Sequence, residues 1–408
     1  MKNNVTIEPK LLIMVTESNN NKVYRMIPHG DTFSVEYGRV GASCQKASYS
    51  MSQWDKKYNE KVKKGYVDQT HLVQDLIQKE EPTTKNGYKE IVNKAISEIV
   101  ERLQSMAKQK IQQNYKVSSQ QVTQAMVDEA QKVIDKLMNS TKVKEFNIIL
   151  LELFGVIPRK MSNVKDYLAS NETDFARILK DEQDLLDVMR GQVVQHTVDN
   201  SKSEATTEEE KGETILEAMG LEFEEVTSED VAMIKSLLGD CRDKFYKAWR
   251  VKNVKTQKRF DDFVEKEKIS QTKLLWHGSR NENWWSIINT GLVLRPTNAV
   301  ITGKMFGYGI YYAPKARKSL GYTSLNGSYW ARGNSNSAFM ALMDVAYGKP
   351  YDVHSFDSKY YNFNYERLQQ TCPGANCLHA HTGAMLRNDE IIVYKEEQCT
   401  IKYLIELK

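Results

Sequence analysis

The sequence predicts an α+β protein of several domains, in which a small mixed domain, an all-helical domain and a mainly β domain follow one another. Residues 1–80 open with short strand-like runs, and helical periodicity dominates residues 88–197. Short apolar runs with Gly and Pro between them follow a polar segment at 199–214. We therefore expect domains at 1–85, 86–200 and 214–408, with a polar linker at 201–213.

The first domain begins with three strand-like runs. Turns containing Asn and Gly separate them, as in a small antiparallel sheet, and they read LLIMV at 11–15, KVYRMI at 22–27 and TFSVEYGRVG at 32–41. A helix is expected from Ser52 to Lys64, because Trp54, Tyr58 and Val62 recur at helical spacing. Gly65 is placed to end that helix.

The second domain is expected to be a helix bundle. One apolar stripe contains Ile91, Val92, Ile96, Ile99 and Leu103. Ser118-x-x-Gln121 has the form of a capping box, and it opens a second stripe formed by Val122, Met126, Val133 and Leu137. The apolar run 148–158 ends at Pro158 and predicts a buried helix.

Composition restricts the class of protein. No apolar run approaches the roughly 20 residues that span a bilayer, so no membrane partner is expected. The five cysteines have no regular spacing, which favours reduced thiols in a soluble intracellular protein. The formal net charge of +4 requires any nucleic-acid surface to be local. No Gly-x-Gly-x-x-Gly follows a strand and no Walker lysine loop occurs, which argues against the usual phosphate-binding folds.

The C-terminal domain contains motifs that suggest chemistry. LLWHGS at 274–279 places a histidine and a glycine at a strand end, GYGIYYA at 307–313 leads glycines into a strand, and Glu390 opens the strand at 391–394. Taken singly, each has an ordinary explanation: a turn with a satisfied histidine, core tyrosines and a solvated glutamate.

Taken in order, LLWHGSR, GLVLRP, ITGKMFGYGIYYA, KSLGY and DEIIVY resemble the poly(ADP-ribose) polymerase family over most of residues 214–408. The resemblance implies a split antiparallel β sandwich that binds extended NAD+. It also implies a His-Tyr-Glu triad at His277, Tyr311 and Glu390.

The same resemblance implies a role for each site residue. The Gly278 backbone and the Ser319 hydroxyl would hold the nicotinamide amide, and Tyr322 and Tyr311 would stack on its ring. His277 would bind the adenine-side ribose. The remaining NAD+-binding positions are Ser279 and Arg295, and Met305 matches the acceptor pocket. Glu390 would accept from the ribose 2′-hydroxyl, stabilise the developing cation and activate an acceptor hydroxyl.

Cys372-x4-Cys377-x-His379-x-His381 is a candidate metal site in the sequence. The ligand types suit zinc, but four ligands within ten residues are awkward for a closed tetrahedral site. The family comparison also places Cys377 on a core strand. The expectation is therefore no metal, with NAD+ consumed as a substrate.

The first two domains resemble further parts of DNA-dependent family members. Tyr37-Gly38-Arg39 resembles the Trp-Gly-Arg motif of WGR domains, with tyrosine in place of tryptophan. Tyr37, Arg39, Lys61, Lys63 and Lys64 are the implied DNA-binding residues; the alternative is a solvated helix face. Residues 88–197 resemble the helical regulatory domain, which would block NAD+ until DNA binds.

The expected protein is a monomeric, DNA-break-activated poly(ADP-ribose) polymerase that modifies protein acceptors, including itself. The polar linker is one possible acceptor, with an inert loop as the alternative. A glutamate at 390 favours polymer formation, while the short segment between Cys377 and Glu390 leaves chain length and branching open. The alternatives are a mono-ADP-ribosyltransferase or a DNA-end binding protein with weak or no catalysis. The expected location is the nucleus in a eukaryote, or the cytoplasm and nucleoid in a bacterium.

Overall fold

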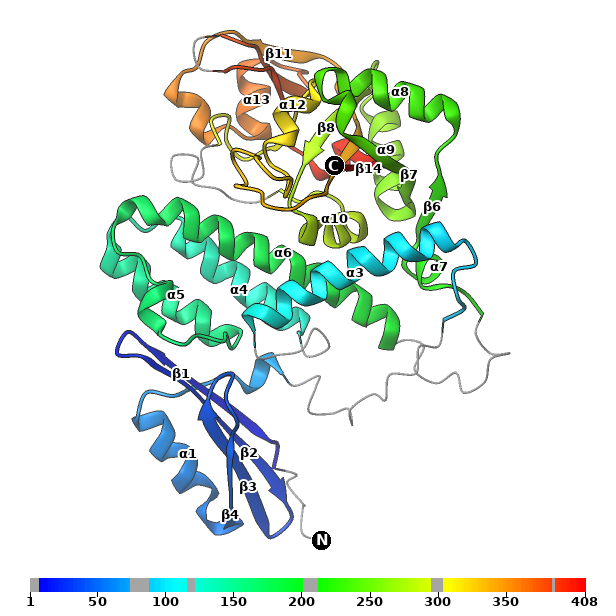
Figure 1. The fold of residues 1–408 in the computed structure, drawn as a ribbon. Helices are drawn as coiled ribbons and strands as arrows, with labels where there is room; N and C mark the ends of the chain where they lie inside the picture. The colour runs from blue at the N-terminus through cyan, green and yellow to red at the C-terminus, as the bar shows by residue number, and fades with distance from the viewer. Residues whose placement is uncertain (1–6, 74–87, 116–121, 201–211, 295–303, 384–385) are drawn as a thin grey trace. The chain divides into compact units, whose positions relative to one another are not determined.

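A computed structural model describes residues 7–73, 88–115, 122–200, 212–294, 304–383 and 386–408 (Figure 1). The chain forms two compact units. The N-terminal unit takes residues 1–84 and 108–193, and the C-terminal unit takes residues 85–107 and 194–408. Within the described part, no helix is both long and apolar enough to cross a membrane.

The N-terminal unit contains an antiparallel five-stranded sheet in the order β4-β3-β2-β1-β5. Its strands are β1 (Lys10–Thr16), β2 (Asn20–His29), β3 (Thr32–Arg39), β4 (Gln45–Ser50) and β5 (Val67–Asp68). Helix α1 (Trp54–Lys63) contributes Trp54 to a core with Phe33. The three predicted strands and the helix are confirmed. Val62 was placed wrongly, because it lies on the exposed face of α1.

This unit also contains α4 (Gln124–Leu137), α5 (Val143–Val156) and most of α6 (Phe175–Asn200). The predicted stripe from Val122 to Leu137 is buried. The capping box at 118–121 falls outside the described residues; Thr123 caps α4 by accepting from the Met126 N–H at 3.1 Å. Helix α5 ends at Val156, two residues before Pro158, as expected. The prediction that it is buried was wrong in part, because only one face is buried and Ile148 is 59% exposed.

Helix α3 (Lys94–Asn114) groups with the C-terminal unit through Ala107. It begins after Ile91 and Val92, and Val92 is fully exposed. The apolar stripe predicted from Ile91 was therefore wrong in its first two members, whereas Ile96, Ile99 and Leu103 are buried.

The C-terminal unit contains two sheets. The five-stranded sheet has the order β6-β7-β14-β10-β8, with β6 (Leu221–Glu225), β7 (Phe245–Asn253), β14 (Cys399–Leu407), β10 (Ala338–Val345) and β8 (Lys273–Gly278). The four-stranded sheet has the order β11-β12-β13-β9, with β11 (Pro350–Val353), β12 (Cys377–Ala380), β13 (Glu390–Val393) and β9 (Ile310–Tyr312). All pairs are antiparallel except β11 with β12.

Short helices surround these sheets. They are α7 (Ile215–Met219), α8 (Ser228–Leu238), α9 (Val254–Lys266), α10 (Trp284–Thr290), α12 (Ala316–Leu320) and α13 (Tyr365–Thr371). Trp276 of β8 and Ala313 exchange backbone hydrogen bonds of 2.9 and 3.0 Å, which connect the ends of β8 and β9. This bridge holds the two sheets together at the predicted NAD+ site.

Candidate active site

Three neighbouring strand ends bring the predicted triad together. His277 lies at the end of β8, Tyr311 in β9 and Glu390 at the start of β13. Strand β13 pairs with β9 so that Ile392 is opposite Tyr311. Nδ1 of His277 lies 3.1 Å from the Tyr311 carbonyl oxygen. Glu390 interacts electrostatically with the Tyr311 side chain. Residues separated by 113 positions in the chain thus form one cluster.

The environment of His277 keeps its imidazole neutral. Burial lowers the pKa of His277 to about 4, only partly offset by its hydrogen bond to the Tyr311 carbonyl, while the nearby Lys304 lowers it further. Because a carbonyl only accepts, Nδ1 must carry the proton. Nε2 is then left as an acceptor, which suits a ligand hydroxyl rather than an anionic phosphate.

Gly278 is required by a close backbone approach. A Cβ at this position would lie 2.0 Å from the Ser319 carbonyl oxygen. The buried Ser319 hydroxyl donates to the Trp276 carbonyl at 3.0 Å. The Ser319 hydroxyl therefore uses its proton in the hydrogen bond to β8, and its oxygen can still accept a hydrogen bond from an N–H donor.

The two tyrosines are held differently. The Tyr311 hydroxyl donates to the Gly307 carbonyl and accepts from the Phe306 N–H, each at 3.0 Å, and burial raises its pKa well above the usual value. The ring of Tyr322 lies nearly parallel to that of Trp330, with centroids 6.2 Å apart. Trp330 itself is exposed. Tyr311 is thus fixed by two hydrogen bonds, while Tyr322 contacts the Trp330 ring and forms a hydrogen bond with the Lys318 side chain.

Glu390 forms an ion pair that sequence reasoning did not identify. Its Oε1 lies 2.5 Å from Nζ of Lys318, on α12, and both side chains are largely buried. Burial lowers the pKa of Lys318, but Glu390 and Tyr322 together more than offset this, so the pKa is raised overall. Lys318 precedes Ser319 in the KSLGY motif, so its position was visible in the sequence although its partner was not.

Other predicted residues lie at the margin or elsewhere. The Ser279 hydroxyl accepts from Asn283 Nδ2 at 3.0 Å. Met305 is partly buried against the apolar cluster that contains Phe306. Arg295 lies outside the described residues. A charged concavity of about 530 Å³ opens over the five-stranded sheet of the C-terminal unit, and none of the predicted site residues that the structure describes lines it.

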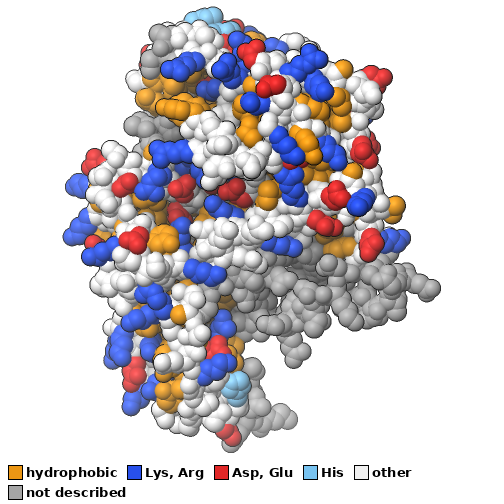
Figure 2. All heavy atoms as spheres, viewed as in Figure 1, with side chains coloured by type: hydrophobic (Ala, Val, Ile, Leu, Met, Phe, Trp, Pro, Cys, Tyr) orange, Lys and Arg blue, Asp and Glu red, His pale blue; other side chains and the backbone are white. Residues whose placement is uncertain are grey.

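The predicted DNA-binding residues lie in the N-terminal unit, where lysines and arginines gather over α1 (Figure 2). Lys63 and Lys64 are exposed. Lys61 instead lies among three tyrosine rings, its Nζ being 4.2, 5.8 and 5.4 Å from the ring centres of Tyr24, Tyr37 and Tyr66. Burial lowers the pKa of Lys61.

Arg39 has partners within its own unit. Its guanidinium donates to the Met161 carbonyl at 2.9 Å and to the Ser162 carbonyl at 2.8 Å, between α5 and α6. It also donates to the Asn19 side chain at 2.8 Å. A residue expected to contact DNA therefore connects the sheet to the helical part of the same unit.

Comparison with known proteins agrees with this geometry. Residues 228–408 match the poly(ADP-ribose) polymerase catalytic domain. Uncharacterized protein 101L of Invertebrate iridescent virus 6 is 35% identical over 195 residues, which is 47% of this chain and 80% of that protein. The poly [ADP-ribose] polymerase-like protein 100L of the same virus is 31% identical over 168 residues, covering 40% of this chain and 87% of its own length.

Poly [ADP-ribose] polymerase 2 of Homo sapiens is 40% identical over 84 residues, which is 21% of this chain and 13% of the human protein. The matched region thus spans most of the length of both viral proteins but only a small part of the human protein. The match to the catalytic domain, over residues 228–408, includes the strands that contain His277, Tyr311 and Glu390. The chain therefore belongs to the poly(ADP-ribose) polymerase family and is an ADP-ribosyltransferase that consumes NAD+ as its substrate.

Proposed function

We propose that the protein is a DNA-break-activated transferase that adds ADP-ribose to protein acceptors, including itself, and extends poly(ADP-ribose) chains. The observation that supports this most is the buried Lys318–Glu390 ion pair beside Tyr311 and the neutral His277. Such a site offers a carboxylate where positive charge develops on the ribose.

The proposed reaction breaks the bond between nicotinamide and ribose. His277 Nε2 accepts from a hydroxyl of the adenine-side ribose. The Gly278 backbone and the Ser319 oxygen engage the nicotinamide amide, between the rings of Tyr311 and Tyr322. As nicotinamide leaves, Glu390 accepts a hydrogen bond from the ribose 2′-hydroxyl and stabilises the oxocarbenium-like cation. Glu390 then takes the proton of the acceptor hydroxyl as it bonds to the ribose carbon. Lys318 orients the carboxylate through their ion pair.

The test of the catalytic assignment is Glu390→Gln. Losing one preorganised electrostatic partner costs on the order of 3–4 kcal/mol, so ADP-ribose transfer from labelled NAD+ should fall at least about a hundredfold. Glu366→Gln, in α13 and exposed, is the matched control and should retain activity. Transfer by Glu390→Gln at the rate of the control would disprove the assignment.

The proposed DNA interface is the α1 side of the N-terminal sheet, which we assign to a WGR-like domain. Exposed Lys63 and Lys64 would contact phosphates, and the tyrosines around Lys61 would supply an aromatic surface. Arg39 would transmit binding, because it already holds the Met161 and Ser162 carbonyls. Lys63→Glu/Lys64→Glu should lower the affinity for nicked or blunt DNA, and the affinity of this variant should depend less steeply on salt concentration than that of the wild type. Unchanged affinity and salt slope would refute this interface.

The proposed gate is the helical domain. Within the C-terminal unit, Arg102 of α3 forms a 2.7 Å ion pair with Glu406 of β14, and Gln195 of α6 accepts from the Trp285 indole at 3.0 Å. DNA binding would loosen these helices and admit NAD+, a use of local unfolding as coupling. The deletion 88–200 should then transfer without DNA, and retained DNA dependence would reject the gate.

Two alternatives have distinct outcomes. A mono-ADP-ribosyltransferase would give a single shift on a gel after treatment with NAD+, whereas chain formation gives a smear. A DNA-end binding protein without catalysis would leave NAD+ unconsumed. The linker at 201–213, a proposed site of automodification, lies almost entirely outside the described residues.

A further inference from the structure

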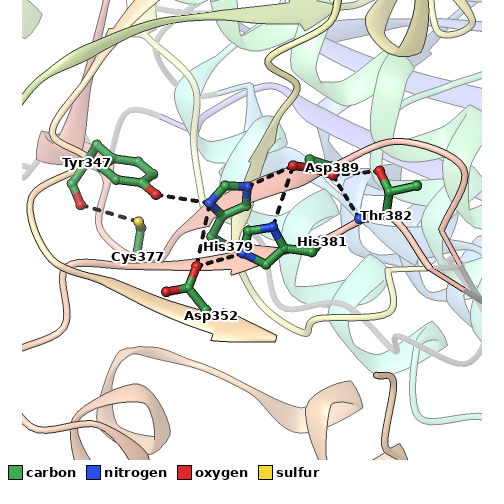
Figure 3. Close-up of polar contacts among 7 residues, drawn as sticks. All are labelled: Tyr347, Asp352, Cys377, His379, His381, Thr382 and Asp389. Carbon is green, nitrogen blue, oxygen red and sulfur yellow. Dashed lines mark hydrogen bonds and ion pairs between the residues drawn. The ribbon is translucent and has the colours of Figure 1, made fainter. Parts of the chain in front are cut away.

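A cluster of histidine and aspartate side chains lies at the edge of the four-stranded sheet (Figure 3). His379 is in β12, and His381 follows the end of that strand. Asp352 comes from the neighbouring strand β11, where the register places it opposite His379. Asp389 directly precedes β13. None of these groups takes part in the proposed transfer chemistry.

On one side of the two rings, three potential ligand atoms converge. Asp352 Oδ1 lies 2.7 Å from Nε2 of His381 and 3.8 Å from Nδ1 of His379. One ligand atom from each of these three residues lies within 4.8 Å of the others. Ligand atoms around a tetrahedral zinc ion lie roughly 3.3 Å apart, given bonds of about 2.0 Å. Small side-chain adjustments would therefore bring the three atoms onto one ion.

On the opposite side of the rings, Asp389 contacts the other nitrogen of each histidine. Its Oδ2 lies 3.2 Å from His379 Nε2 and 3.6 Å from His381 Nδ1. Its second oxygen accepts from the Thr382 N–H at 2.8 Å and the Thr382 hydroxyl at 2.6 Å. Histidines that bind metals characteristically direct their other ring nitrogen to such a carboxylate, which fixes the ring and raises its basicity.

We propose that Asp352, His379 and His381 form a site for a transition-metal dication of the Zn²⁺ class, with Asp389 as the positioning residue. Two imidazoles and one carboxylate favour Zn²⁺ over Mg²⁺ or Ca²⁺, which prefer oxygen ligands. The site is accessible, since the Asp352 side chain is 48% exposed and that of His381 27%. The Tyr347 hydroxyl, 2.9 Å from His379 Nδ1, or a water completes the coordination.

This assignment differs from the cysteine–histidine site weighed in the sequence. The buried Cys377 directs its thiol to the Tyr347 carbonyl at 3.2 Å. Cys372 lies at the end of α13. The ligand that joins the histidines is Asp352, which is 27 positions before His379 in the chain. A bound ion would fix β11 to β12 and, through Asp389, the residue next to Glu390. The inference does not depend on the proposed function.

The test uses the full-length chain, freed of any affinity tag and treated with EDTA. Isothermal titration with ZnCl₂ should show about one ion per chain, and the melting temperature should rise with ZnCl₂ concentration. Co²⁺ should give the visible absorption of a low-symmetry site. His379→Gln/His381→Gln should lose the binding. Asp389→Asn should weaken it by about 10- to 100-fold.

The matched control is His29→Gln/His71→Gln, which removes two exposed histidines from the N-terminal unit and should leave Zn²⁺ affinity unchanged. Asp352→Asn provides a second ligand variant at a half-exposed position, should the double histidine variant fail to fold. Equal Zn²⁺ affinity in the wild-type chain and in a folded ligand variant overturns the proposal. So does the absence of binding to the wild-type chain, which would leave a hydrogen-bonded histidine–aspartate network only.

Discussion

The substitution Arg102→Ala tests whether helix α3 restrains the transferase. Arg102 donates to Glu406 at 2.7 Å and to the Ser337 hydroxyl at 2.7 Å, and its guanidinium lies 5.0 Å from the ring centre of Phe339. The Glu406 side chain is only 3% exposed, whereas that of Arg102 is 41% exposed. Removing Arg102 leaves the buried Glu406 carboxylate without this cationic partner while α3 is docked, which destabilises the docked state.

The size of the effect follows from this burial. Hydrogen bonds to charged groups contribute about 1.5–3 kcal/mol. Because water reaches part of Arg102, we expect the lower end, about 1.5–2 kcal/mol. Each 1.4 kcal/mol is about tenfold in an equilibrium, so the population with α3 released should rise about 10- to 30-fold. If release admits NAD+, the rate without DNA should rise by a similar factor.

The assay is NAD+ consumption by the full-length chain, with and without nicked DNA. Lys94→Ala is the matched control, because Lys94 on the same helix forms only an exposed 4.0 Å pair with Glu98. Lys94→Ala should leave the DNA-free rate unchanged, and the rate with DNA should be similar in all three proteins. Identical DNA-free rates for Arg102→Ala and Lys94→Ala, with both proteins folded, would refute restraint through this contact.

Two further predictions concern the C-terminal unit. Lys318→Met should reduce transfer about 10- to 100-fold, because Glu390 loses the ion pair that orients it; activity equal to wild type would show that the pair is dispensable. Asp230→Asn should lower the free energy of unfolding at neutral pH by about 1–2 kcal/mol. Hydrogen bonds from Arg250 are the main cause that holds the pKa of Asp230 below its usual value, and water screens them because the Arg250 side chain is 45% exposed. A carboxyl group whose pKa is lowered in the folded state stabilises that state at pH values above its unfolded pKa. The difference in melting temperature between the wild type and Asp230→Asn should therefore shrink below about pH 4. A difference that stays constant with pH would contradict this prediction.

Local pattern predicted much of the fold, because alternation and helical spacing are properties of contiguous residues. Strands β1 to β3, helix α1 and the buried face of α4 follow their sequence signals closely. Helix starts were harder to place. Val92 continues the helical spacing but precedes α3, which begins at Lys94 after Asn93 accepts hydrogen bonds from the first N–H groups.

Interactions between distant segments were not predictable in the same way. Two of the groups that Arg39 contacts are backbone carbonyls more than 120 positions away. Every residue has a backbone carbonyl, so the residue types in the sequence do not reveal such a contact. Asp352 joins His379 because β11 and β12 run parallel, which no local motif requires. Lys318 lay within a recognised motif, yet only the pairing of β9 with β13 brings Glu390 to it.

The state of the site groups constrains how activity can be controlled. His277 is neutral with Nε2 available, the Tyr311 hydroxyl is fixed by two hydrogen bonds, and Glu390 is held by Lys318. If these groups carry out the transfer as proposed, their geometry leaves little for an activator to assemble. Control by DNA should therefore act on access of NAD+ rather than on the chemical step. Release of α3, by DNA or by Arg102→Ala, should accordingly lower KM for NAD+ more than it raises kcat.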